Sequence, residues 1–368
     1  MALKYTGHPI AVLGGGNGGH CMAADLTLAG QAVHWCELPE LAGGKFAPVL
    51  EKGTVSLTGI GRTGTVRPAL ITTDMATALE GSKLINLAIP AFGHGRFYAE
   101  MIPHLQDGQV VVVWAGDFGA IELYTRLRRD RPGLKVDVVE ANTLPYGTRL
   151  TGPAEVELIL SAPLVTAAAV PAARNAEVLP GISELWPCVR ATQNALSAAF
   201  SNPNPIVHPP GSLLNVGRIQ YSEGDFYMYG EGITEAVARV IRDVYDEMAG
   251  IAALYGSEVL QYEDRDFRTT VSIMGVAFQA PFDTVGEIAR IIGPKTIYDR
   301  YITEDLPMGL VPAAQLARLA GKPAHLVEAI IYLGSSVCGM DFWKEGRTLE
   351  KLGLAGMTVE DIVNLVSG

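Results

Sequence analysis

The chain changes its hydrophobic pattern about halfway along its length. In the first half, short apolar runs end in polar or glycine-rich turns, and stretches with helical spacing lie between several of these runs. This alternation of strands and helices predicts a doubly wound α/β sheet of mainly parallel strands. The expected strands are 10–13, 32–36, 83–89, 109–114, 136–140 and 155–160, with helices that include 20–29, 97–105 and 120–129.

The second half has no such alternation. After about Pro180 the apolar positions recur at helical spacing, which predicts an all-α domain. We therefore expect two domains, 1–182 and 183–368. The expected helices of the second domain are 182–200, 235–255, 312–320, 324–337 and 359–366.

Length, charge and cysteine usage limit the class of protein. The 368 residues suffice for two domains, and a net charge of −11 argues against a nucleic-acid surface, which needs a clustered basic face. No run approaches the ~20 consecutive apolar residues of a membrane span, and residues 1–9 lack the features of a signal peptide. The four cysteines show no paired spacing, so we expect a reduced, cytoplasmic protein with neither disulfides nor a metal site.

A glycine-rich loop directly follows the first expected strand. Gly14, Gly16 and Gly19 match the spacing Gly-x-Gly-x-x-Gly at the start of a helix, with Asn17 and Gly18 between them. In this motif the first glycine permits a tight turn, the second lets the backbone approach a pyrophosphate, and the third lets helix and strand pack closely. The helix N-terminus supplies hydrogen-bond donors and a positive dipole end. The loop therefore predicts a Rossmann domain that binds a dinucleotide.

An acidic residue, Glu37, ends the second expected strand, 23 positions after Gly14 (37 − 14). A carboxylate there suits the adenosine ribose hydroxyls and repels a 2′-phosphate, so we expect NAD(H) rather than NADP(H). The alternative is a side chain that merely faces solvent. Two further strand ends, one with Pro90 and Ala91 and one with Gly116, are expected either at the same crevice or as ordinary turns.

Hydride transfer also needs a group that exchanges a proton beside the reacting carbon. Among seven histidines, His208 differs because prolines surround it in segment 202–210. The prolines predict extended backbone around the ring and a helix that begins at Pro209 or Pro210. A ring at a helix N-terminus would require a carboxylate partner to become charged. From the residues alone, a structural His208 is as plausible as a catalytic one, and His94 is a second candidate.

Several segments together resemble the opine dehydrogenase family, which includes octopine-type enzymes and bacterial N-(carboxyethyl)-amino-acid dehydrogenases. The resemblance extends over nearly the whole chain, and the family has a Rossmann domain followed by a helical substrate domain. The segments that carry it are 12–20, Asn204-Pro205 with His208-Pro209, Arg300-Tyr301 with Glu304-Asp305, 309–312 and 344–354.

The resemblance implies roles for three residues of the helical half. His208 would be the general acid/base, Asp305 would pair with it and favour the protonated ring, and Arg300 would bind a carboxylate, for which its planar guanidinium is suited. The implied reaction condenses a 2-oxo acid with an amino acid or amine, and NADH reduces the imine to a secondary amine. The reverse reaction oxidises the opine. Without the resemblance, Arg300 and Asp305 would be interpreted as a surface ion pair.

Two other functions stay open at this stage. A carbonyl reductase for a 2-oxo acid or sugar phosphate would share the two-domain plan and use a lysine, for which Lys295 is available. An NAD(H)-binding sensor would keep the fold without turnover. The aromatic and acidic segment 221–229 is expected either to line the amino-donor pocket or to act as a lid or packing element. For the assembly we expect a homodimer, the commonest symmetric arrangement.

Overall fold

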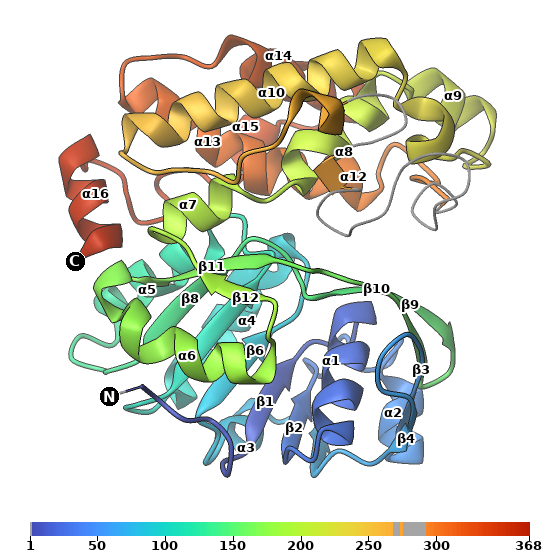
Figure 1. Cartoon of the computed structure of the whole chain (residues 1–368), viewed down its shortest axis with the longest axis vertical. Helices are drawn as coiled ribbons and strands as arrows, with labels where there is room; N and C mark the ends of the chain where they lie inside the picture. Colours follow the sequence, from blue (N-terminus) through green and yellow to red (C-terminus); the bar gives the residue numbers. More distant parts are fainter. Residues whose placement is uncertain (1, 268–272, 275–291) are drawn as a thin grey trace. The chain divides into compact units, whose positions relative to one another are not determined.

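The computed structural model of the chain describes residues 2–267, 273–274 and 292–368 (Figure 1). The chain divides into two compact units, Met1–Ala195 with Ser367–Gly368, and Leu196–Val366. Within the described residues, every strand belongs to the first unit and the second unit contains helices only. The two-part α/β and all-α architecture expected from the sequence is therefore confirmed.

An eight-stranded sheet forms the centre of the first unit. Its strand order is β12-β11-β8-β7-β6-β1-β2-β5; the six strands from β8 to β5 are parallel, and β11 runs antiparallel to β8. The order reverses between β1 and β6, the position where ligands bind in open α/β sheets. The strands are β1 (Ile10–Leu13), β2 (Val33–Cys36), β5 (Leu70–Thr72), β6 (Leu84–Leu87), β7 (Val110–Trp114), β8 (Asp137–Ala141), β11 (Val165–Val170) and β12 (Val189–Ala191).

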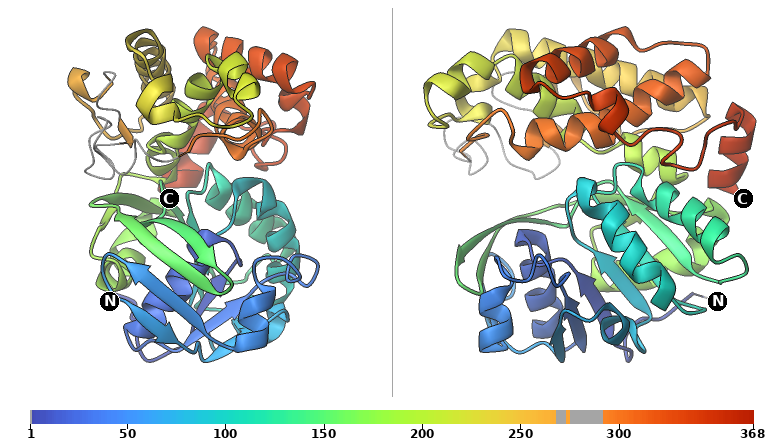
Figure 2. Two further views of the ribbon diagram at one scale, coloured as in Figure 1. Left: turned by 90° about the vertical axis from the view of Figure 1, so that its right-hand side faces the viewer. Right: turned by 180° about the vertical axis from the view of Figure 1, so that it is seen from behind.

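Helices cover both faces of this sheet. Figure 1 shows α1 and α6 in front of the strands, and the rear view in Figure 2 shows α4 and α5 on the other face. Because both faces are covered, a central strand can be apolar and buried along its whole length, as Val110–Trp114 is. The helices of the unit are α1 (Asn17–Leu28), α2 (Ala47–Lys52), α3 (Met75–Leu79), α4 (His94–Met101), α5 (Gly119–Asp130) and α6 (Asn175–Leu185), and the 3-10 turns are Ala91–Gly93, Ile102–His104 and Ala172–Arg174.

A second, four-stranded sheet packs against α1. Its order is β4-β3-β10-β9, with strands β3 (Val55–Gly59), β4 (Gly64–Val66), β9 (Tyr146–Gly152) and β10 (Glu155–Ser161). The expected strand 155–160 was assigned to the doubly wound sheet, and that assignment was wrong. The strand pairs with its hairpin partner β9 and with β3, and this pairing places it in the smaller sheet.

The expected helix 182–200 was also wrong over part of its length. Helix α6 ends at Leu185, strand β12 follows, and a new helix, α7 (Ala195–Phe200), begins after it. Pro187 disfavours continuation of the helix, and Val189 pairs with Val165 at the edge of the large sheet. Three residues of strand are too few for a period of two to be visible in the sequence.

The longest described helix of the second unit is the amphipathic α10 (Glu235–Leu254). Its buried residues recur every three or four positions, from Val237 to Ala252, as expected for a helix with one face in a core. The other elements are α8 (Asn204–Leu213), α9 (Val216–Tyr221), the π-helical turn η4 (Met228–Gly232), the 3-10 turn η5 (Asp264–Phe267), α12 (Arg300–Thr303), the π-helical turn η6 (Asp305–Leu310), α13 (Val311–Leu319), α14 (His325–Cys338), α15 (Phe342–Glu345) and α16 (Val359–Ser367).

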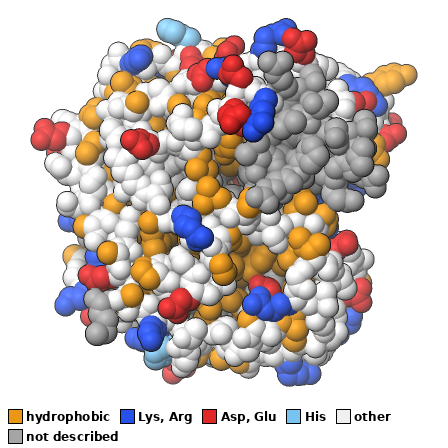
Figure 3. Space-filling view, in the orientation of Figure 1, with side chains coloured by type: hydrophobic (Ala, Val, Ile, Leu, Met, Phe, Trp, Pro, Cys, Tyr) orange, Lys and Arg blue, Asp and Glu red, His pale blue; other side chains and the backbone are white. Residues whose placement is uncertain are grey.

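The surface carries charges of both signs. Figure 3 shows Lys and Arg interspersed with Asp and Glu over the face that it displays. None of the described helices has the length and apolar character needed to cross a membrane. All four cysteines are free thiols, and within the described ranges no group of three or more His, Cys, Asp or Glu side chains is placed to hold a metal ion.

Candidate active site

The glycine loop between β1 and α1 has the shape that a bound pyrophosphate requires. Gly14 has a φ of +117°, and a Cβ on it would collide with Ala88 and Ile89 at the end of β6. A Cβ on Gly19 would overlap the carbonyl oxygen of Gly14, so the third glycine allows the helix to pack on the strand. At Gly16, by contrast, no described atom lies within 4 Å of an added Cβ. The open side of the loop is thus at the second glycine, and the loop fits a dinucleotide.

The first turn of α1 is available to an anion. Its N-cap, Gly16, has no side chain to cap the helix, and no acidic residue lies in the first turn. Asn17 faces the second sheet, where its Oδ1 accepts a hydrogen bond from the N–H of Leu150 at 3.4 Å and its carbonyl oxygen accepts one from the hydroxyl of Thr148 at 3.1 Å. Gly18 lies against Leu144. Asn17 therefore anchors the loop to the second sheet, and the backbone N–H groups are left to face a phosphate.

Glu37 lies beside the glycine loop and is buried. Its Oε2 accepts a hydrogen bond from the N–H of Gly15 at 2.7 Å, and its Oε1 accepts one from the N–H of Leu38 at 2.8 Å. Burial raises the pKa of the Glu37 carboxyl, while the two backbone donors oppose that shift. Glu37 does not merely face solvent: it braces the loop, and each oxygen still has a lone pair for a ribose hydroxyl.

A cluster of aromatic side chains, which sequence analysis did not predict as part of the site, packs against the glycine loop. The indole N–H of Trp35 donates to the carbonyl oxygen of Gly14 at 2.9 Å, and the Trp35 ring makes edge contacts with His20 and Phe46. His20 is fully buried and its Nδ1 lies 2.9 Å from the carbonyl oxygen of Gly16. Burial lowers the pKa of His20 to about 4, so its ring is neutral at physiological pH. In the sequence, Trp35 within the second expected strand could have indicated this aromatic cluster.

The other predicted cofactor residues follow the ends of β6 and β7. Pro90 and Ala91 lead into a short 3-10 turn after β6. Gly116 lies in a tight loop after β7 where Ala115, Asp117 and Phe118 all have positive φ, an uncommon conformation for residues other than glycine. Strained backbone of this kind concentrates at functional sites.

A buried carboxylate, Glu140, holds that loop in place. Its Oε1 accepts the N–H of Phe118 at 2.9 Å, and its Oε2 accepts the N–H of Ala120 at 2.7 Å, at the start of α5. Sequence reasoning assigned Glu140 no contact of its own. The available sequence signal was a charged residue directly after the apolar pair Val138-Val139, near the end of the strand.

His208 lies in the middle of helix α8, and this corrects the expected extended segment. The helix runs through Pro209 and Pro210, so neither proline opens it and the ring is not at a helix N-terminus. Two features start the helix earlier: Pro205 occupies its first turn, where a proline is well tolerated, and the side chain of Asn202 accepts the N–H of Asn204 at 3.0 Å. A proline inside a helix is costly, so packing against the neighbouring elements outweighs local propensity here.

Three side chains fix the His208 ring. Its Nδ1 lies 2.7 Å from Oδ2 of Asp305, and its Nε2 lies 2.8 Å from the hydroxyl of Tyr229. The ring of Tyr301 stacks on it with centroids 3.8 Å apart and planes 2° from parallel. The structure thus brings together the predicted pair of His208 and Asp305, and it adds two tyrosines that were not named as site residues.

The carboxyl group of Asp305 is strongly perturbed. Burial raises its pKa well above the ordinary value and the neighbouring carboxylate of Glu304 raises it further, whereas the Arg300 guanidinium opposes both. A buried carboxyl with a raised pKa holds a proton more tightly than an exposed one, and Nδ1 of His208 lies beside this carboxyl.

Arg300 lies on the same short segment as Asp305. Its Nε forms an ion pair with Oε2 of Glu304 at 2.9 Å, and its side chain is 54% exposed while that of Glu304 is buried. Interpreted as a surface ion pair, Arg300 was expected to pair with Asp305. In the structure its ion-pair partner is Glu304. A guanidinium held at one edge by a buried carboxylate is a preorganised binding group for a carboxylate ligand.

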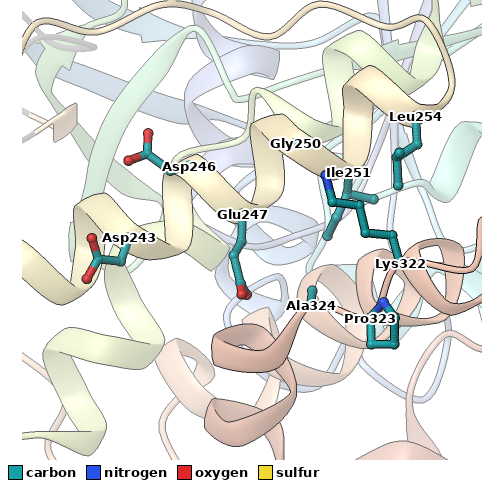
Figure 4. Close-up of a pocket in the computed structure, with 9 residues that line it drawn as sticks. All are labelled: Asp243, Asp246, Glu247, Gly250, Ile251, Leu254, Lys322, Pro323 and Ala324. Carbon is teal, nitrogen blue, oxygen red and sulfur yellow. The ribbon is translucent and has the colours of Figure 1, made fainter.

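The remaining candidates are His94 in the first unit and Lys295 in the second. His94 is buried at the start of α4, with its ring tilted against Tyr98. Lys295 is exposed. A surface groove of about 340 Å³ lies between the C-terminal half of α10 and the start of α14, and no predicted site residue lines it (Figure 4). Its lining includes Asp243, Asp246, Glu247 and Lys322.

A Rossmann unit with an intact dinucleotide loop, followed by a helical unit with a buried His–Asp pair, defines an NAD-dependent oxidoreductase of the two-domain type. An opine dehydrogenase of Arthrobacter sp. (strain 1C) is 31% identical over 360 residues, which cover 97% of this chain and 98% of the relative. The chain belongs to the opine dehydrogenase family. The family model described as "NAD/NADP octopine/nopaline dehydrogenase, alpha-helical domain" matches residues 191–338.

A more distant relative agrees with this assignment, and solved structures share the fold. Octopine dehydrogenase of Mizuhopecten yessoensis is 26% identical over 401 residues, covering 95% of this chain and 94% of the relative. An octopine dehydrogenase structure with NADH and pyruvate shares the fold with a TM-score of 0.72 at 20% identity, over 96% of this chain and 97% of that one. A ketopantoate reductase from Ralstonia eutropha JMP134 is similar at a TM-score of 0.59 and 15% identity, over 92% and 99% of the chains.

Proposed function

We propose that the protein is an NAD(H)-dependent opine dehydrogenase that condenses a 2-oxo acid with the amino group of an amino acid or amine. The product is a secondary amine, and the reverse reaction oxidises it. The observation that carries the proposal is the buried contact between His208 and Asp305, five positions from Arg300 (305 − 300). It places a proton-exchanging ring beside a carboxylate, and that carboxylate lies on the same short segment as a cation for an acid.

His208 is the proposed general acid/base. Condensation requires that the amine nitrogen lose a proton and that the oxo oxygen leave as water, so one group must first accept and then deliver a proton. Asp305 holds Nδ1 and stabilises the charged ring, which leaves Nε2 as the nitrogen that exchanges the proton. Arg300 binds the carboxylate of the 2-oxo acid through its terminal nitrogens, because its Nε already pairs with Glu304.

The first domain, 1–182 by the sequence boundary, is the proposed dinucleotide site, and 183–368 is the substrate domain. Bound NADH supplies the hydride for the reduction. The backbone around Gly14, Gly16 and Gly19 with Asn17 and Gly18 would hold the pyrophosphate, and Glu37 the adenosine ribose. Pro90, Ala91 and Gly116, at the ends of β6 and β7, are proposed to line the same crevice.

The proposed substrates are small and carry at least one carboxylate. Octopine dehydrogenase structures contain NADH with pyruvate, L-arginine or agmatine. In this chain the cation on Arg300 supports a 2-oxo acid as the electrophile. We further propose that the protein is a cytoplasmic homodimer; its four free thiols suit a reducing compartment, and light scattering after gel filtration would test the dimer.

The test is NADH oxidation, followed at the absorbance of reduced nicotinamide near 340 nm. Each 2-oxo acid is supplied alone and with a panel of amino acids and amines, and products are identified by mass. Oxidation that needs both partners and yields a secondary amine supports the proposal. Arg300→Lys should then raise KM for the oxo acid about tenfold or more, because an ammonium cannot form the two parallel hydrogen bonds of a guanidinium.

The competing function is a carbonyl reductase, which the fold similarity to ketopantoate reductase favours. Oxidation of NADH with an oxo acid alone, giving an alcohol, would establish that function and contradict the imine mechanism. Lys295, the lysine that such a reductase would need, is exposed. Absence of oxidation over a broad panel, together with tight NADH binding, would instead indicate a dinucleotide sensor.

A further inference from the structure

The second nitrogen of the His208 ring has a partner to which no role has been assigned. The hydroxyl of Tyr229 lies 2.8 Å from Nε2, and Tyr229 is only 3% exposed. Asp305 occupies Nδ1 on the other side of the ring. Both partners lie on π-helical turns, Tyr229 on η4 and Asp305 at the start of η6. Such turns are rare and are often found at functional sites.

The turn that carries Tyr229 is fastened to the helix that carries His208. Asn215, at the end of α8, donates from Nδ2 to the carbonyl oxygens of Gly211 at 2.8 Å and Gly232 at 3.0 Å. Met228 packs so closely on α8 that a Cβ on Gly211 would come within 2.8 Å of its sulfur. The two residues therefore belong to one rigid arrangement, and their contact does not depend on a flexible loop.

A hydroxyl is well suited to this position because of the chemistry proposed for the ring. A general acid/base alternates between a neutral form, in which Nε2 accepts a hydrogen bond, and a charged form, in which Nε2–H donates one. A carboxylate pairs only with the donor and an ammonium only with the acceptor, whereas a phenol hydroxyl serves both. In a buried site an unpaired nitrogen is costly, so a partner that serves both forms keeps the ring in place before and after each proton transfer.

We propose that Tyr229 is a positioning residue that holds Nε2 of His208 in both protonation states between its proton transfers with the substrate, while Asp305 holds Nδ1 and Tyr301 the ring face. This inference rests on the proposed role of His208 as the acid/base. It gives the segment 221–229 a defined function at its end: the last residue of the aromatic segment orients the catalytic ring.

The test compares Tyr229→Phe with Tyr255→Phe in the full-length enzyme. Tyr255 is a matched control, since it is buried in the same unit and its hydroxyl donates to the carbonyl oxygen of Leu316 at 2.9 Å, away from His208. Loss of a buried hydroxyl should lower the melting temperature similarly in both variants. Only Tyr229→Phe should lower kcat, by about ten- to a hundredfold, the range that misplacing a catalytic group costs. KM for each substrate and NADH affinity should change by less than about threefold, because the hydroxyl contacts the ring rather than a binding group.

A second readout needs no turnover. In protein labelled with ¹⁵N-histidine, the His208 Nε2 resonance, identified by its loss in His208→Asn, should move in Tyr229→Phe and stay in Tyr255→Phe. An unmoved resonance, or a moved resonance with kcat within about twofold of wild type, would overturn the positioning role. So would Tyr229→Phe with full activity beside an inactive Tyr229→Leu, because the ring and not the hydroxyl would then matter. A wild-type enzyme inactive on every substrate pair would refute the proposed function, whereas the resonance would still report the contact itself.

Discussion

His208 and Asp305 are 97 positions apart in the chain, yet Nδ1 of the imidazole lies 2.7 Å from Oδ2 of the carboxylate. Both side chains are almost fully buried. A carboxylate in this position selects the ring tautomer and stabilises the charged form of the ring. The pair thus provides what a general acid/base needs, and it depends on helix α8 and the η6 turn packing against each other.

We expect Asp305→Asn to lower kcat by about 10²- to 10⁴-fold. The amide cannot stabilise the imidazolium and can favour the wrong tautomer, so most of the acid/base contribution is lost. NADH affinity, measured by fluorescence titration, should stay within about twofold, because the dinucleotide loop lies in the other unit. A kcat within tenfold of wild type, with full NADH binding, would contradict the role assigned to the pair.

Substitutions of two glycines in the loop should both weaken NADH binding, but only one of them should also lower the stability of the fold. Gly16→Ala places a methyl group in open space, so the fold should be kept, while NADH affinity falls about tenfold or more because the pyrophosphate approaches there. Gly19→Ala places it on the carbonyl oxygen of Gly14, so the melting temperature should fall together with NADH binding. Calorimetry and NADH titration of both variants test this, and normal NADH binding by Gly16→Ala would place the pyrophosphate elsewhere.

Glu37→Ala should weaken NADH binding and reduce the preference for NADH over NADPH. The variant removes the acceptor for the N–H groups of Gly15 and Leu38 as well as the charge that repels a 2′-phosphate. Glu51, which is exposed on α2, offers a control for the loss of one negative charge. The ratio of kcat/KM for the two cofactors is the quantity to measure. If this ratio is the same in Glu37→Ala, Glu51→Ala and wild type, Glu37 does not bind the adenosine ribose.

His20 should make the first unit sensitive to acid. Its pKa is about 4 in the folded protein and 6.5 in the unfolded chain, so between these values the unfolded state binds a proton that the folded state does not. Stability is therefore unaffected above pH 6.5 and is lost as pH falls toward 4. At pH 5 the loss is about 2 kcal/mol (1.5 pH units at about 1.36 kcal/mol each).

The measurement is chemical denaturation at pH 7 and pH 5, followed by tryptophan fluorescence. Three of the four tryptophans, Trp35, Trp114 and Trp186, lie in the first unit, so the signal reports mainly on it. His20→Asn should lose less stability than wild type between the two pH values, because its side chain does not titrate. Equal losses in the two proteins would show that another group is responsible.

Local patterns sufficed wherever one segment carries its own signal. The buried strand 110–114, the amphipathic helix 235–254 and the glycine loop were visible because burial on both faces, burial on one face and a tight turn each impose a residue pattern on adjacent positions. The roles of His208, Arg300 and Asp305 could also be predicted, but only through the resemblance to a family.

The sequence by itself determined the α/β and all-α plan and the dinucleotide loop, and it indicated the His208–Asp305 pair only through the resemblance to a family. Only the tertiary structure decided that His208 sits within a helix, since packing held Pro209 and Pro210 in a conformation that their local preference opposes. It also revealed Tyr229, Tyr301, Trp35 and Glu140, whose partners are between 20 and 93 positions away. Such contacts leave no periodic trace, because they are set by how separate elements pack and not by the spacing of neighbours along the chain.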